Sequence, residues 1–136
     1  NMVQTITKEW QITKMYIYEV VLRDGVISLD WDDFETFAEK HRPKVAIRNK
    51  GDAPVKELVK EAMDKVQRTC SGKPSGIIIS ISYKKGDEIK MDEMFGLSDS
   101  MDEIASENVE IKWGISQGES LESKRSVCIF IFGQYE

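Results

Sequence analysis

Three carboxylates, Asp30, Asp32 and Asp33, form the cluster in this sequence whose spacing most suggests chemistry. A carboxylate can orient or polarise a water molecule beside a reacting group, so the cluster is a candidate functional site. The same residues suit the start of a helix, because Asp30 can cap the first free amides and Asp33 adds negative charge at the positive end of the helix dipole. On the residues alone both interpretations stay open, and the helix cap is the more common use of this pattern.

Other reactive residue types give weaker signals. His41, the one histidine, follows a predicted helix, where its charged form suits the helix dipole, and we prefer this interpretation to a catalytic or ligand role. The loop at residues 72–76 resembles a phosphate loop in composition, but its glycine spacing differs and a strand follows it. No nucleophile–base pair or metal-ligand set is visible, so an unrelated enzyme is disfavoured. We expect this chain to bind no metal or cofactor by itself.

The composition indicates one globular domain. A chain of 136 residues, 40% apolar and 32% charged, can bury one core, whereas two domains would each be too small. The net charge is −5, and the basic residues form no stripe interleaved with aromatic residues. Nucleic acid is therefore not an expected partner.

Neither a membrane span nor a signal peptide is visible. The longest apolar run, residues 127–132, is far too short to cross a bilayer. The first residues alternate polar and apolar types instead of forming the apolar core of a signal peptide, so we expect a cytoplasmic protein. In a reducing compartment, Cys70 and Cys128 are expected to be free thiols.

Three helices are predicted from apolar residues at helical spacing. The first covers residues 30–40, and the second begins at an Asp52 cap, carries Pro54 in its first turn and runs to residue 66. A third, kinked helix at residues 91–105 would bury Met91, Met94 and Met101 in the core. The apolar stripe of the second helix is the clearest of the three: Val55, Leu58, Val59, Ala62, Met63 and Val66.

Five runs rich in β-branched and aromatic residues are predicted as strands: residues 13–22, 44–48, 77–83, 108–116 and 126–133. The run at 77–83 places its isoleucines on one face, which indicates a strand covered mainly on one side. The last two strands are expected to form a terminal hairpin. Helices alternating with strands before this hairpin predict an α/β (α+β) fold, a single domain with a mixed sheet backed by helices.

One segment brings a family resemblance. Residues 25–33, GVISLDWDD, resemble the synergy loop of FtsZ, whose pattern is G-x-x-N-x-D-x-x-D: Gly25, Asp30 and Asp33 match, and Ser28 replaces the asparagine. The resemblance continues in order along most of the chain. It covers the pieces at residues 45–47, 55–66, 75–81, 108–114 and 127–133.

The resemblance implies the C-terminal domain of an FtsZ-like cell-division protein, with a mixed four-stranded sheet backed by helices at residues 25–136. Residues 1–24 would then be an N-terminal extension, either a strand or a linker. In this family, subunits stack head to tail, and the synergy-loop carboxylates reach the GTP of the next subunit. Asp30 and Asp33 would inherit this role in trans, whereas Ser28 keeps a hydroxyl but loses the amide.

The resemblance also limits what the chain can do alone. The nucleotide signature of the family, GGGTGTG, is absent, so GTP is expected only if an N-terminal GTPase domain is present. The expected partners are further copies or other FtsZ-like subunits. The alternative is a free-standing binding module that keeps the fold without GTPase activity. The open reading frame upstream of Met2 distinguishes the two, because only the first requires a GTPase domain there.

Overall fold

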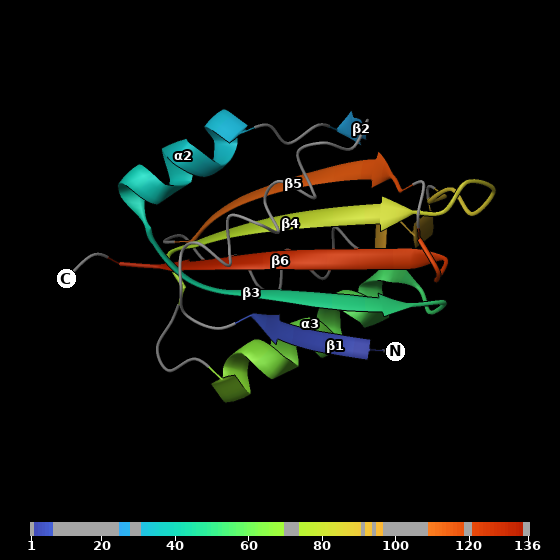
Figure 1. The fold of residues 1–136 in the computed structure, drawn as a ribbon, viewed down its shortest axis with the longest axis horizontal. Coiled ribbons are helices and arrows are strands. Elements are labelled where there is room, and N and C mark those ends of the chain that lie inside the picture. Colours follow the sequence, from blue (N-terminus) through green and yellow to red (C-terminus); the bar gives the residue numbers. More distant parts are fainter. Residues whose placement is uncertain are drawn as a thin grey trace.

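The elements in chain order are β1 (Met2–Ile6), β2 (Gly25–Ile27), α2 (Trp31–Lys40), β3 (Arg42–Gly51), α3 (Val55–Thr69), β4 (Gly76–Tyr83), β5 (Glu110–Gln117) and β6 (Arg125–Gly133). Figure 1 shows them in a computed structural model, which describes residues 2–6, 25–27, 31–69, 74–90, 92–93, 95–96, 109–118 and 121–134. The strands form one mixed sheet in the order β1-β3-β6-β4-β5-β2.

The four long strands, β3, β6, β4 and β5, form the predicted mixed sheet, and the short strands β1 and β2 extend it at its two edges. Strand β6 lies between β3 and β4 and is antiparallel to both, whereas β4 and β5 are parallel. The predicted hairpin of the last two strands is therefore wrong. Strand β6 is apolar on both faces and takes a central position, whereas β5 carries charged residues on one face and lies nearer the edge.

The main core lies between the sheet and α3. Alternate residues of a strand point to opposite faces, so Ile77, Ile79 and Ile81 of β4 share a face with Ile129 and Ile131 of β6. The apolar stripe predicted for α3 packs on this face, with five of its six members buried and Met63 partly buried. The amphipathic pattern of the sequence is thus satisfied by one layer of contacts.

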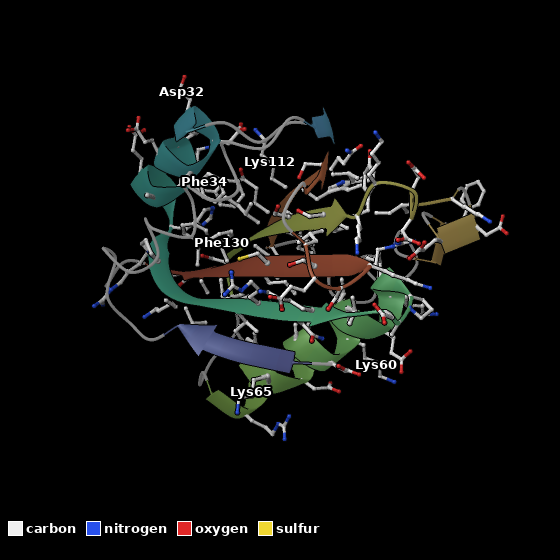
Figure 2. All side chains as sticks on the ribbon, turned by 45° about the vertical axis from the view of Figure 1, so that its right-hand side comes forward. Asp32, Phe34, Lys60, Lys65, Lys112 and Phe130 are labelled. Carbon is white, nitrogen blue, oxygen red and sulfur yellow. The ribbon has the colours of Figure 1, made fainter. Side chains whose placement is uncertain are left out.

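The opposite face of the sheet packs against α2. The ring of Phe34 meets that of Phe130 edge to face (Figure 2), with centroids 5.0 Å apart. The ring of Phe37 meets that of Phe132 with centroids 5.3 Å apart. In β4, Ile78 and the two serines that alternate with its core isoleucines are also buried. The expectation that this strand is covered mainly on one side is therefore wrong, because the chain covers both faces of the sheet.

Helix α3 begins differently from the prediction. Asp52 lies three residues before the first helical residue, too early for an N-cap, and its carboxylate accepts a hydrogen bond from the amide of Lys124 at 3.0 Å. The first amide of the helix, that of Val55, instead donates to Glu93 Oε1 at 2.9 Å. A carboxylate distant in sequence thus satisfies the helix end, which no local pattern could predict.

Glu93 also binds Arg125. This pair joins the segment at residues 92–93 to the start of β6, to residues 87–88 and to the start of α3. The guanidinium of Arg125 donates to both carboxylate oxygens of Glu93, at 3.3 and 3.0 Å, and to the carbonyls of Asp87 and Glu88. Burial acts to raise the pKa of Glu93, but hydrogen bonds from Arg125 and the Val55 amide outweigh it and hold the pKa below its ordinary value. The Glu93 carboxylate is therefore stabilised in its charged form.

Several sequence predictions fall outside the described residues. These are the strand at 13–22, the three methionines of the helix at 91–105, Cys70, and the cap at Asp30. Of the extension predicted at residues 1–24, the described part is β1, which pairs antiparallel with β3. Cys128 is described, and it is a buried free thiol as predicted.

Gly76 offers a test of the packing between α2 and the sheet. A Cβ atom at this position would lie 2.9 Å from Phe37 Cε1 and 3.0 Å from His41 Cδ2, so Gly76→Ala must displace these two side chains. We expect a loss of about 1–3 kcal/mol in the free energy of unfolding, measured by urea denaturation. The matched control is Gly96→Ala, whose nearest neighbour would be 3.8 Å away. Equal effects in the two variants would contradict this packing.

The Glu93–Arg125 pair predicts a pH dependence of stability. Because the folded pKa of Glu93 lies below the ordinary value of 4.5, its contribution is fully present above that value and is lost as the pH falls through the folded pKa. We expect Glu93→Gln to cost about 1–3 kcal/mol at pH 7. The difference from wild type should shrink below pH 4.5, measured by urea denaturation across this range. A difference that stays constant down to acid pH would argue against the pair.

Candidate functional site

Residues 25–33, the segment predicted to carry the site, begin in β2 and end in α2, and both elements contact β5. The first three of these residues form β2, which pairs antiparallel with β5 and places Gly25 opposite Ser116 and Ile27 opposite Ile115. The last three residues open α2. Ser28 and Asp30 connect these two elements and lie outside the described residues, so of the three predicted site residues only Asp33 has a described position.

Helix α2 forms because its residue types agree with its surroundings. Phe34 and Phe37 are buried against β6, while Asp32 and Asp33 lie in the first turn and Lys40 in the last. This charge order favours the helix dipole. Asp32 is exposed at the outer end of the helix (Figure 2). The helix-cap interpretation of the acidic cluster thus agrees with the placement of Asp32 and Asp33 in the first turn.

Asp33 forms an ion pair with Lys112 of β5. The Asp33 side chain is only 16% exposed, whereas that of Lys112 is 44% exposed. Lys112 lies opposite Ile78 in the parallel register, which places it on the α2 face of the sheet. The first turn of α2 is therefore tied to β5, and the carboxylate of Asp33 has a cation of its own chain beside it.

The other end of α2 is held by His41. Its Nδ1 lies 2.8 Å from the hydroxyl oxygen of Ser75, and its Nε2 lies 3.3 Å from Oε2 of Glu110. A carboxylate can only accept, so Nε2 carries the hydrogen, and in the neutral ring Nδ1 accepts from Ser75. The backbone amide of His41 also donates to the carbonyl of Phe37 at 2.7 Å. The ring thus links the end of α2 to the starts of β4 and β5.

The structure brings together a serine, a histidine and a glutamate that the sequence reading did not connect. Such a set is a nucleophile–base arrangement in some hydrolases. The sequence analysis found no nucleophile–base pair, whereas the fold places these three side chains in contact. Ser75, however, is buried, and its backbone amide donates to the carbonyl of Phe132 at 2.9 Å, so this amide is not free to stabilise an oxyanion. The set therefore acts as a structural link.

Both ends of α2 are thus held by one face of β5. Glu110 and Lys112 alternate with Ile111 and Trp113, which pack against the core on the other side. The period-two alternation was a visible signal that these charged residues point away from the core. Their partners were not visible, because the pairing of β5 with β4 brings Glu110 beside Ser75 and only tertiary packing brings α2 over Lys112.

Across the described ranges, no group of three or more His, Cys, Asp or Glu residues is arranged to hold a metal ion. No helix in the described part of the chain is long and apolar enough to cross a membrane.

Lys112→Ala tests the tie between β5 and α2. Because the lysine is partly exposed, we expect a loss of only about 0.5–1 kcal/mol in the free energy of unfolding. Amide hydrogen exchange in the first turn of α2 should become faster, while α3 should be unchanged. The charge-matched control, Lys60→Ala, removes an exposed lysine from α3. If α2 exchanges at the same rate in both variants, Lys112 does not hold this helix.

Solved structures of FtsZ from M. jannaschii have a similar fold. One is described as an empty FtsZ dimer and is 20% identical to this chain. The match covers 90% of this chain and 36% of the FtsZ chain, with a TM-score of 0.59. A second is a tryptophan-to-tyrosine mutant of FtsZ and is 19% identical to this chain. The match covers 91% of this chain and 38% of the FtsZ chain, with a TM-score of 0.65.

The predicted resemblance to FtsZ is confirmed at the level of the fold. The chain spans little more than a third of the length of these FtsZ chains. No protein-family model matches the sequence, and no curated protein matches it.

Proposed function

We propose that this chain is the C-terminal domain of an FtsZ-like cytoskeletal protein of the cytoplasm, which stacks head to tail with further subunits. The observation that carries the proposal is the synergy-loop pattern at residues 25–33, which leads into α2 on an FtsZ-like fold. Similar solved chains are more than twice as long as this one, which leaves room in them for a GTPase domain. One of these chains is described as a dimer.

In this proposal, Asp30 and Asp33 complete the GTPase site of the neighbouring subunit. Hydrolysis of a nucleotide requires a water molecule held in line with the γ-phosphate, and a carboxylate is suited to orient it. A carboxylate at a subunit boundary can do so only after assembly, which couples hydrolysis to the filament. Lys112 supports this role as a positioning residue, because it fixes Asp33 relative to the sheet.

The GTP itself would be bound by an N-terminal domain of the same protein or by the neighbouring subunit. The residue that departs from the FtsZ pattern, Ser28, keeps a hydroxyl that can donate or accept a hydrogen bond. It cannot reproduce the two amide hydrogens and the carbonyl of asparagine. We therefore expect slower GTP turnover than with asparagine at this position.

The test uses the full-length protein encoded by the native open reading frame. Asp30→Ala combined with Asp33→Ala should lower GTP turnover by at least about 100-fold, because the attacking water loses its orienting groups. Filaments should still sediment with GTP. The control is Asp32→Ala, which removes an exposed carboxylate of the same turn outside the matched positions. Circular dichroism checks that each variant is folded. Unchanged turnover in the double variant would rule out the synergy role.

A second function is favoured by the pairing of Asp33 with Lys112. An aspartate neutralised within its own chain is less available to a neighbouring nucleotide, which suits a free-standing binding module that has kept the fold without GTPase activity. Such a module would associate with FtsZ-like subunits without completing their sites. It is distinguished by an open reading frame that starts at Met2, and by a chain that binds filaments without changing their GTP turnover.

A further inference from the structure

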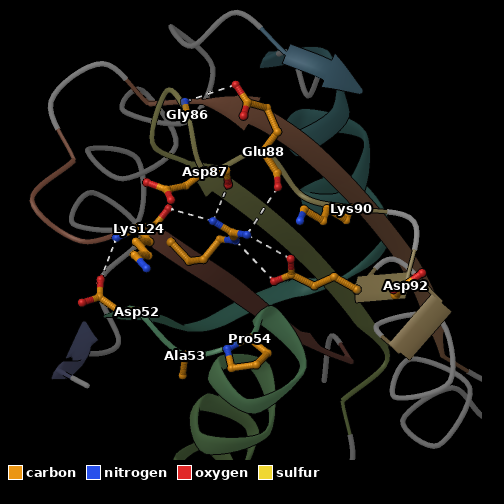
Figure 3. A pocket seen from close by; sticks show the side chains of 11 residues that line it. Asp52, Ala53, Pro54, Gly86, Asp87, Glu88, Lys90, Asp92 and Lys124 are labelled. Carbon is orange, nitrogen blue, oxygen red and sulfur yellow. Dashed lines mark hydrogen bonds and ion pairs between the residues drawn. The ribbon is translucent and has the colours of Figure 1, made fainter.

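The ion pairs that Glu93 and Asp33 form differ in how much of the cation reaches solvent. In the pair of Glu93 with Arg125, the side chains are 16% and 12% exposed. Arg125 also donates to the carbonyls of Asp87 and Glu88, in the wall of a pocket between the start of α3 and the connection after β4 (Figure 3). This guanidinium is thus enclosed by groups of its own chain.

Lys112 is presented in another way. Its side chain is 44% exposed, although the Asp33 side chain that it contacts is only 16% exposed. An ammonium group has three N–H donors, and within the described residues Asp33 is the only partner recorded for Lys112. Its nitrogen therefore keeps donors and open surface for a second negatively charged group.

The strand fixes where this cation lies. Lys112 is in register with Ile78 of the central strand β4 and shares the α2 face with Glu110, two residues earlier. Glu110 contacts His41 at the other end of α2, with 3.3 Å between Oε2 and Nε2. A side chain carried by a strand is held more precisely than one carried by a loop. The backbone of Lys112 is therefore fixed, while its long side chain can still reach outward from the first turn of α2.

A cation at this place meets a need of the proposed GTPase site. The first turn of α2 carries carboxylates, and a carboxylate close to a nucleotide triphosphate repels it. Sites of phosphoryl transfer offset this repulsion with lysine, arginine or a metal ion, which also stabilises the charge on the γ-phosphate. Within the described residues, Lys112 is the cation recorded in contact with these carboxylates.

We propose that Lys112 is a catalytic residue of the GTPase site in the neighbouring subunit, where its ammonium group binds the γ-phosphate. The inference rests on the function proposed above and extends the role of Lys112 beyond fixing Asp33. Water bonds to the γ-phosphorus, the bond from this phosphorus to the β–γ bridging oxygen breaks, and GDP leaves with the electron pair. The proton of the water ends on the phosphate product. Lys112 keeps its own proton throughout and acts by charge.

The test measures GTP turnover of the full-length protein in sedimented filaments. Lys112→Gln should lower kcat about 10-fold to 100-fold, because the charge on the γ-phosphate loses its cation. Lys112→Arg keeps the charge and should stay within about threefold of wild type. GTP binding by unassembled subunits should be unchanged, because Lys112 acts only across the subunit boundary. The matched control is Lys60→Gln, which removes an exposed lysine of α3 and should leave turnover within about twofold.

An Asp33→Asn background separates a direct role from an indirect one. If Lys112 binds the phosphate, Lys112→Gln should lower turnover at least about threefold further in this background. If it causes no further loss there, Lys112 acts only by positioning Asp33, and the proposal is overturned.

The double variant Asp30→Ala with Asp33→Ala separates this inference from the function on which it rests. Turnover that falls in the double variant but not in Lys112→Gln overturns the role of Lys112 alone. Turnover that is unchanged in both overturns the synergy role together with it.

Discussion

Burial of β6 on both faces is the constraint on which the rest of the structure depends. Its alternate residues must find apolar cover on two sides, so Ile129 and Ile131 pack beneath α3 while Phe130 and Phe132 pack beneath α2. A strand of this kind cannot lie at an edge without exposing several large side chains to water. Its central position between β3 and β4 makes the sheet mixed and leaves β5 toward the edge.

The position of β5 explains how the candidate site is held. One face of this strand still needs apolar cover and contributes Ile111 and Trp113 to the core, while the other carries charge. That charged face is available to α2, and it binds both ends of the helix through Lys112 and Glu110. The aromatic contacts of α2 with β6 supply most of the burial, and the polar contacts with β5 fix its orientation.

The two ends of the sheet serve different purposes. At the starts of β4 and β5, neutral and charged side chains hold α2 in place. At the end of β4, the Glu93–Arg125 pair holds together the connections that line a pocket.

The sequence by itself determined the helices α2 and α3 and the four long strands, but not the short edge strands β1 and β2. The stripe of α3 and the alternation of charged and apolar residues in β5 follow from periodicity, and the pattern of Gly25, Asp30 and Asp33 pointed to the FtsZ-like fold. Only the tertiary structure decided which strands are neighbours, and which side chains cap or pair with one another. Glu93 accepts from the Val55 amide, 38 positions away in the sequence. Lys112 pairs with Asp33, 79 positions away. Such contacts depend on three-dimensional packing, which local sequence patterns do not encode.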